Sequence, residues 1–205
     1  MSVLVFDPYF AEMIKRERTR TGADRFDEVW DGVYVMSPPP NFDHQRISRM
    51  LANAFEHLLD KKSTVAQEFA ISDREEDWTN NYRVPDVSVF LPENPGVNRK
   101  TYWYGGADFV VEIASPGDRT REKLPFYAKV KTREVLIVDL EDPAIELHRL
   151  DESEHKLVGR AIPGSRTKLE SAVLPLRFTL KKNRSNASIE VSRLDDDQKW
   201  LVKMT

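Results

Sequence analysis

The sequence predicts an α/β fold in which a mixed β-sheet is flanked by α-helices. Short runs rich in β-branched and aromatic residues recur along the chain, and segments with apolar residues spaced three and four apart interrupt them. Strands mixed with two or three helices are typical of one α/β or α+β domain. We therefore expect a single domain over residues 1–205, with its core at about residues 8–150 and additional strands over residues 151–205.

The composition is that of a folded protein in a reducing compartment. Hydrophobic residues make up 40% and charged residues 32% of the chain, and there is no cysteine. No uncharged stretch reaches the ~18 residues of a membrane helix. The apolar N-terminus meets Asp7 too early for a signal peptide, so we expect a cytoplasmic protein. The net charge of -3 gives no general attraction to nucleic acid, and such binding would depend on local clusters.

The first third of the chain carries helix and hairpin signals. An N-cap aspartate followed by proline predicts a helix over residues 7–20, which a glycine then ends. The dipeptide Asp31-Gly32 predicts a β-hairpin over residues 26–36. The longest predicted helix covers residues 41–59, because its apolar residues fall on one face.

The rest of the chain is predicted to be mainly strands. A third helix is expected at about residues 121–130. The expected strands are residues 64–71, 84–91, 108–114, 134–140, 144–150, 156–162, 172–180, 187–194 and 199–204.

Two of these strands carry a carboxylate among apolar residues. Glu112 lies in VVEIA, and Asp86 lies in VPDVSVFL. An ionised carboxylate there costs several kcal/mol unless it is paired, hydrogen-bonded or bound to a metal. If the strands pair with Asp86 beside Glu112, the acids repel each other, and a divalent cation is the simplest relief. The structural alternative is that Asp86 caps a loop and Glu112 pairs with an arginine.

The residue types favour a hard cation and a nearby amine. Mg²⁺ takes oxygen ligands, typically one or two carboxylates, whereas zinc sites need histidine or cysteine spacings that are absent. Lys123 lies in a basic cluster over residues 119–133 and could position a water or offset negative charge. Asp86 and Glu112 are therefore the expected metal ligands, and Lys123 is the expected charge stabiliser.

Short motifs follow one another in a distinctive order along the chain. They are DEVWDGVYVMSPPP at residues 27–40, His44-Gln45-Arg46, Pro85-Asp86, Glu112 with Ser115-Pro116, Lys123, Tyr127 and EVLIVD at residues 134–139. Their order and spacing resemble the Uma family of restriction endonucleases, a bacterial group within the PD-(D/E)XK nuclease superfamily. The resemblance covers about residues 10–150.

The resemblance implies a restriction-endonuclease-like core whose acids and lysine surround Mg²⁺, with Mn²⁺ as a substitute. Such an enzyme hydrolyses phosphodiester bonds of DNA with a metal-activated water. By position, Asp86 and Glu112 match the two acids of the superfamily motif. Glu28 matches a further catalytic acid that many members place on an early helix, although a salt bridge to Arg25 or Arg46 is an equal alternative. A homodimer is expected by analogy alone, since restriction-type nucleases often dimerise.

The chain departs from the superfamily pattern at the lysine. The residue two positions after the second acid is Ala114, not lysine. In the family the amine lies on the following helix, which makes Lys123 the candidate and Lys129 the reserve. Gln67 or Glu68, on an adjacent predicted strand, could complete the site.

Two other classes of protein remain open. A catalytically silent module of nuclease fold could bind DNA or a protein partner, and the acidic net charge is compatible with it. Absence of a Mg²⁺ or Mn²⁺ site would favour this reading. A glycoside hydrolase could use the same two acids, but it needs one protonated carboxyl group and no metal, and the lysine gives sugar chemistry nothing obvious.

Overall fold

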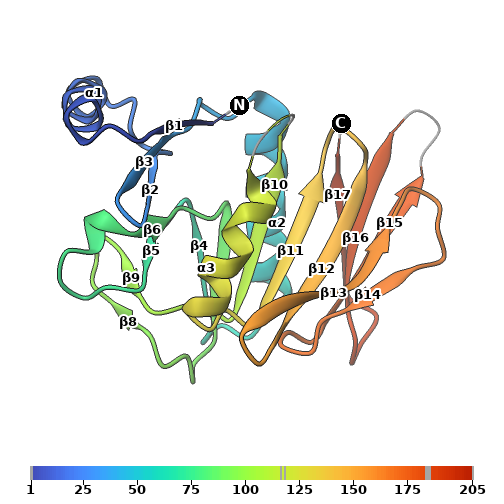
Figure 1. The fold of residues 1–205 in the computed structure, drawn as a ribbon. Helices are drawn as coiled ribbons and strands as arrows, with labels where there is room; N and C mark the ends of the chain where they lie inside the picture. Colours follow the sequence, from blue (N-terminus) through green and yellow to red (C-terminus); the bar gives the residue numbers. More distant parts are fainter. Residues whose placement is uncertain (1, 116, 118, 183–185, 205) are drawn as a thin grey trace.

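The computed structural model of the protein describes residues 2–115, 117, 119–182 and 186–204, so Pro116 of the quoted motif lies outside the described residues. The strands form three sheets, here named A, B and C (Figure 1). Their strand orders are β1-β3-β2-β6-β5-β9-β8 in sheet A, β13-β12-β11-β10-β7-β4 in sheet B and β14-β15-β16-β17 in sheet C. Over the described residues, helices that combine the length and the apolar character needed to cross a membrane are absent.

Sheet B is a mixed sheet at the centre of the molecule. Its strands are β4 (Thr64–Gln67), β7 (Val87–Phe90), β10 (Phe109–Ala114), β11 (Glu134–Asp139), β12 (Ala144–Asp151) and β13 (Glu154–Ala161). Strands β10 and β11 run parallel, whereas their outer neighbours are antiparallel. A parallel pair requires a crossover, and here it contains the short helices η2 (Thr120–Lys123) and α3 (Leu124–Lys129).

The two faces of sheet B are covered by different elements (Figure 1). Helix α2 (Phe42–Leu58) packs with Val111 and Ile113 on one face, and α3 packs with Val110 on the other. Because side chains alternate along a strand, Glu112 faces the α3 side together with Val110. The crossover therefore carries Lys123 to the face on which Glu112 lies.

Sheet A is assembled from short strands around the predicted hairpin. Its strands are β1 (Val3–Val5), β2 (Glu28–Trp30), β3 (Val33–Met36), β5 (Ile71–Ser72), β6 (Tyr82–Arg83), β8 (Val97–Asn98) and β9 (Trp103–Tyr104), and the short helix η1 (Trp78–Asn80) precedes β6. Asp31 and Gly32 have φ values of 47° and 88°, as the predicted two-residue hairpin turn requires. Helix α1 (Pro8–Thr21) is capped by Asp7 as predicted, and none of its residues is buried.

Sheet C contains the additional C-terminal strands β14 (Lys168–Glu170), β15 (Leu176–Lys182), β16 (Ala187–Arg193) and β17 (Lys199–Lys203). It shares a hydrophobic core with α2 and sheet B. In that core the ring of Phe178 lies 6.2 Å from Phe55 and 5.7 Å from Phe109, measured between centroids. The sheet thus adds packing on the side of sheet B away from α3.

The structure confirms the predicted fold class, a restriction-endonuclease-like mixed sheet flanked by helices with extra C-terminal strands. The prediction of one strand over residues 64–71 is wrong, because β4 belongs to sheet B and β5 to sheet A. Glu68 between them has a φ of 51°, which breaks the extended backbone. The strand predicted at residues 84–91 is also shorter, since regular pairing begins only at Val87.

Candidate active site at the junction of two sheets

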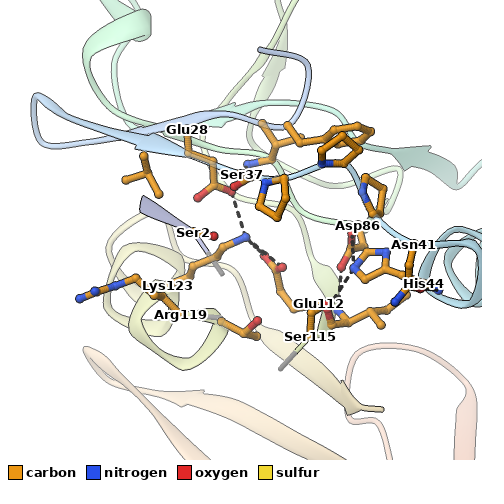
Figure 2. A pocket seen from close by; sticks show the side chains of 18 of the residues that line it. Ser2, Glu28, Ser37, Asn41, His44, Asp86, Glu112, Ser115, Arg119 and Lys123 are labelled. Carbon is orange, nitrogen blue, oxygen red and sulfur yellow. Dashed lines mark hydrogen bonds and ion pairs between the residues drawn. The ribbon is translucent and has the colours of Figure 1, made fainter. Parts of the chain in front are cut away.

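A pocket of about 260 Å³ lies where sheet A meets the α3 face of sheet B. Figure 2 shows polar side chains from several separate chain segments turned into it. The residues that line the pocket include Glu28, His44, Asp86, Glu112, Arg119 and Lys123. All four residues that the sequence proposes as catalytic, Asp86, Glu112, Lys123 and Glu28, therefore line one pocket.

Asp86 and Glu112 come together through the pairing of β7 with β10. Val111 lies opposite Val87 in this antiparallel pair, so the next positions along the two chains are Glu112 and Asp86. Asp86 lies just outside β7, and its Oδ2 accepts a hydrogen bond of 2.6 Å from the backbone N–H of Ile113. This contact holds the Asp86 carboxylate beside the strand that carries Glu112.

Glu112 is buried and meets two donors from the α3 segment. The Lys123 ammonium lies 3.1 Å from its Oε1 and 3.0 Å from its Oε2, and the Tyr127 hydroxyl donates to Oε1. Lys123 and Tyr127 are four residues apart, and residues at this spacing lie on the same face of a helix. The alternative that an arginine pairs with Glu112 is wrong, since its cationic partner is a lysine.

Glu28 reaches the pocket from sheet A. Its Oε1 accepts from the backbone N–H of Val84 at 2.8 Å and lies 2.9 Å from the Lys123 ammonium. Its Oε2 accepts from the indole N–H of Trp30 at 2.6 Å. The salt bridge to Arg25 or Arg46 is not formed: Arg25 pairs with Glu68 and Arg46 with Asp43.

Lys123 stands between the two sheets (Figure 2). It is the last residue of η2, and α3 follows directly with Pro125 in its first turn, where the missing N–H leaves no helical bond unmade. Arg121 in the same short helix lies 3.0 Å from Glu146 of β12, which fixes η2 on the sheet. A lysine in the crossover can therefore reach Glu112 although the residue two positions after Glu112 is Ala114.

Three carboxylates of the pocket act on the ammonium of Lys123. Burial raises the pKa of Asp86 to about 7 and that of Glu112 to about 8, although the Lys123 ammonium opposes both shifts. Burial alone would lower the pKa of Lys123, but the carboxylates of Glu112, Glu28 and Asp86 outweigh it and raise that pKa. Lys123 is therefore an ammonium at neutral pH, while the two acids titrate close to neutrality.

His44 forms the α2 side of the pocket. Its backbone N–H donates to the N-cap residue Asn41 at 2.9 Å, which places the imidazole at the first turn of the helix. The Nε2 atom lies 3.0 Å from the carbonyl oxygen of Ile113 and 3.5 Å from Oδ1 of Asp86. His44 thus contacts the segment that also binds Asp86.

Other candidates from the sequence lie apart from the pocket lining. The Lys129 ammonium pairs with Asp73 at 2.6 Å, so the structure brings Lys123 and not Lys129 to the acids. Gln67 donates to the hydroxyl of Ser48 at 2.9 Å. Ser48 in turn donates to the backbone carbonyl of Asp86 at 3.2 Å, so Gln67 supports the Asp86 backbone and does not line the pocket.

Sequence reasoning misses the part played by Tyr127. Within LPFYAK a tyrosine is indistinguishable from the apolar residues that fill a core, and Tyr127 is indeed buried. Its spacing of four from Lys123 is the signal that could have found it, because that spacing places both side chains on one face of a helix. Burial raises the pKa of the Tyr127 hydroxyl well above its ordinary value, so it remains a donor to Glu112.

Asp86 and Glu112 are the side chains best placed to hold a cation. Within the described part of the chain, no three acidic or histidine side chains converge closely enough to coordinate an ion by themselves. The third carboxylate, Glu28, is bound to Lys123 and to two N–H donors. Glu112 also contacts Lys123 and accepts from Tyr127, so both glutamates hold the ammonium, and Asp86 with Glu112 is the adjacent pair that could hold a cation.

A mixed sheet with paired acids and an amine at one edge pocket defines a protein of the restriction-endonuclease-like class. A family model described as "Uma2: Putative restriction endonuclease" matches residues 11–181, and the chain belongs to this Uma2 family. A solved structure described as "a putative nuclease belonging to DUF820 from Anabaena variabilis ATCC 29413" is similar, with 17% identity and a TM-score of 0.53. The match covers 64% of this chain and 75% of that chain. Curated proteins gave no match.

Proposed function

We propose that the protein is a Mg²⁺-dependent endonuclease of the PD-(D/E)XK superfamily that hydrolyses phosphodiester bonds of DNA. Asp86, Glu112, Lys123 and Glu28 are its proposed catalytic residues. The observation that carries the proposal is the convergence of these four side chains, from three strand regions and one crossover, in a single pocket. Membership of the Uma2 family and the fold shared with a protein described as a nuclease support it.

The donor chemistry of the pocket fits a hard divalent cation. Two carboxylates, Asp86 and Glu112, are the number that Mg²⁺ usually takes from a protein, with water and substrate phosphate as its other ligands. Burial raises the pKa of both acids, because a buried negative charge is unfavourable. Protons offset this charge when no metal is bound, and a cation between the two acids would offset it instead. When bound, the cation supplies Lewis-acid polarisation of the phosphate and lowers the pKa of a water.

Lys123 has the charge and the support that phosphoryl chemistry requires. As an ammonium it contacts three carboxylate oxygens, two of Glu112 and one of Glu28, so a phosphate oxygen or a water would take the place of one of these contacts. A fixed cation beside a phosphate stabilises the negative charge that grows during attack at phosphorus. Glu28 orients this ammonium, and Tyr127 orients the Glu112 carboxylate through its hydroxyl.

A cleavage assay on supercoiled plasmid DNA tests the proposal. The wild-type protein should nick or linearise the plasmid with Mg²⁺ or Mn²⁺ and not with EDTA, and Asp86→Asn should lose the activity. The matched control is Asp108→Asn, because Asp108, like Asp86, accepts a hydrogen bond from a backbone N–H but lies elsewhere. Metal-dependent cleavage that survives Asp86→Asn would contradict the assignment of this ligand.

A silent nuclease-fold module is the competing proposal, and a metal titration separates the two. Calorimetry with Mg²⁺ or Mn²⁺ should show a site in the wild type that weakens in Asp86→Ala and in Glu112→Ala. A protein that binds neither ion and cleaves no DNA would favour the silent module. The homodimer expected by analogy stays a prediction, which sedimentation of the purified protein can test.

A further inference from the structure

Arg83 carries a positive charge into the interior next to the candidate active site. It ends β6, and only 4% of its surface is exposed. Within the described part of the chain its side chain forms no ion pair with a carboxylate. Its Nη1 instead donates to the backbone carbonyl of Val29 at 2.9 Å and to the side chain of Asn81 at 3.1 Å.

The guanidinium lies over two aromatic rings. Its central carbon lies 4.7 Å from the centroid of the Trp30 ring and 4.2 Å from that of Phe126. Trp30 belongs to β2 of sheet A, and Phe126 belongs to α3 on sheet B. The planar cation therefore fills the contact between the two parts of the molecule that share the pocket.

Each ring is linked to a proposed catalytic side chain, Trp30 by a hydrogen bond and Phe126 through the backbone of the crossover. The indole N–H of Trp30 donates to Glu28 at 2.6 Å, and Phe126 follows Lys123 by three residues in the same crossover. Glu28 and Lys123 then meet at 2.9 Å. We call the following series of links the circuit. Arg83 contacts the Trp30 ring, Trp30 donates to Glu28, and Glu28 pairs with Lys123. The backbone joins Lys123 to Phe126, whose ring contacts Arg83.

A buried cation without a carboxylate partner is expensive. Desolvation of such a charge costs several kcal/mol, and an apolar side chain of similar volume could fill the space between the rings without that cost. A guanidinium gains from cation–π contact with both rings, and its flat shape stacks where the compact ammonium of lysine does not. A guanidinium can therefore hold the two rings together at a position where a lysine could not.

We propose that Arg83 is a positioning residue of the active site, which sets the distance between Glu28 and Lys123 by fixing the Trp30 strand against the Phe126 helix. The proposal deepens the nuclease function and rests on it as far as Lys123 is catalytic. Arg83 touches no substrate in this account. Its effect on the reaction passes through the position of the Lys123 ammonium.

The first test observes Lys123 directly, without metal or substrate. The ammonium donates to two carboxylates and its side chain is only 15% exposed, so its protons exchange slowly enough for detection by NMR on protein labelled with ¹⁵N at lysine. The signal is assigned by its loss in Lys123→Met. In Arg83→Met and Arg83→Lys we expect this signal to be lost to exchange with water, because the two sheets no longer hold the ammonium.

The matched control is Arg193→Met. Arg193 lies at the end of β16 in sheet C and also joins two elements. Its Nη1 donates to the backbone carbonyl of Leu58, the last residue of α2, at 2.8 Å. The Lys123 signal should survive this change. Survival of the Lys123 signal in folded Arg83→Met would overturn the proposal. Survival in Arg83→Lys would also overturn it, because a positive charge without the planar guanidinium would then be enough to hold the ammonium in place.

The second test divides the kinetic parameters. A positioning role predicts that kcat falls roughly 10- to 100-fold in Arg83→Lys, while KM for DNA changes by no more than about twofold. A rise in KM with unchanged kcat would contradict it. A wild-type protein that cleaves no DNA would refute the nuclease function, and the Lys123 signal would still decide the positioning role.

Two further variants decide the proposal if the Arg83 variants do not fold. Phe126→Leu removes one of the two rings that contact Arg83 and keeps the guanidinium. Trp30→Phe keeps an aromatic face and removes the N–H that holds Glu28. Both should lose the Lys123 signal. An unchanged Lys123 signal in both folded variants would show that the circuit does not position the ammonium.

Discussion

Two buried glutamates on adjacent parallel strands have very different surroundings. Glu112 of β10 and Glu134 of β11 are 3% and 0% exposed. Glu134 faces sheet C, where it accepts from the Ser171 hydroxyl, from the backbone N–H of Ala172 at 3.0 Å and from Arg149 at 2.7 Å. Glu112 faces a pocket and shares one ammonium with Glu28.

The difference shows that a carboxylate in an apolar strand is not by itself evidence of function. Glu134 has a guanidinium of its own and two further donors, so its charge is balanced within the protein. Around Glu112, the carboxylates of Glu28, Asp86 and Glu112 surround the single ammonium of Lys123. The number of acids per cation, together with access to a pocket, distinguishes a site from a structural network.

The largest expected effect is a difference in DNA cleavage between variants of Glu112 and of Glu134. Glu112→Gln should reduce metal-dependent plasmid cleavage by at least about 100-fold, because an amide does not replace an anionic metal ligand. Glu134→Gln should cleave at the wild-type rate under conditions in which it is folded. The check is the initial rate of nicking, with the folded fraction of each variant measured by circular dichroism. Equal losses in both variants would remove the distinction.

The pH dependence of stability should report on the two acids of the pocket, Asp86 and Glu112. The folded-state pKa of Asp86 is raised from 3.8 to about 7 and that of Glu112 from 4.5 to about 8. A raised pKa gives stability that is complete below the ordinary value and is lost as the pH rises through the folded value. Without metal, the free energy of unfolding should therefore lose several kcal/mol between pH ~4 and ~8, because each tenfold difference in proton affinity between the folded and unfolded chain corresponds to about 1.4 kcal/mol.

Urea unfolding in EDTA at a series of pH values measures this loss. The useful quantity is the difference between the wild type and the Asp86→Asn, Glu112→Gln double variant, because other carboxylates affect both proteins alike. That difference should change across the window. Parallel curves for the wild type and the double variant would refute the raised pKa values.

A smaller effect concerns the stability contributed by Glu134. Glu134→Gln should lower the free energy of unfolding by about 1–3 kcal/mol, because it disturbs three hydrogen bonds of a fully buried group. Glu170→Gln is the control, since Glu170 forms an exposed pair with Arg177 and exposed pairs contribute roughly 1 kcal/mol or less. Denaturant titration at neutral pH checks both. Similar values for the two would mean that burial adds nothing to the Glu134 network.

The smallest effect should come from the hydroxyl of Tyr127. Tyr127→Phe removes one donor to Glu112 and should cost about 1 kcal/mol of stability, with a fall in cleavage of about 10-fold or less. Tyr34→Phe is a close control, because Tyr34 is a buried tyrosine that donates to the buried Asp27. It should show a similar loss of stability and no loss of cleavage. If cleavage fell in Tyr34→Phe and not in Tyr127→Phe, the supporting tyrosine of the site would be Tyr34 and not Tyr127.

The adjacency of the two acids could be predicted from the sequence. Asp86 and Glu112 each interrupt an apolar strand, and strands of that kind pair within one sheet. Lys123 follows from its place in the basic cluster after Glu112 and from the resemblance to the family, and the crossover geometry explains how it reaches the site. Glu28 could be assigned only through that resemblance, because nothing in a short hairpin strand indicates which distant segment it will meet.

Other features depend on tertiary contacts that no local pattern records. The break between β4 and β5 occurs at Glu68, with no glycine or proline to announce the positive φ. Arg83 next to VPDV looks like an ordinary charged residue at a strand edge, yet its partners Trp30 and Phe126 lie more than forty residues away on either side. The assignment of β14, a three-residue strand, depends on its pairing with β15.

The carboxylates of the pocket are tied to one another through the main chain. Glu28 accepts from the N–H of Val84, two residues before Asp86, and Asp86 accepts from the N–H of Ile113, next to Glu112. Truncating one acid to alanine would release the segment that presents the next. Alanine scanning would then exaggerate the share of each residue, so amide replacements of matching shape are the fairer probe of this pocket.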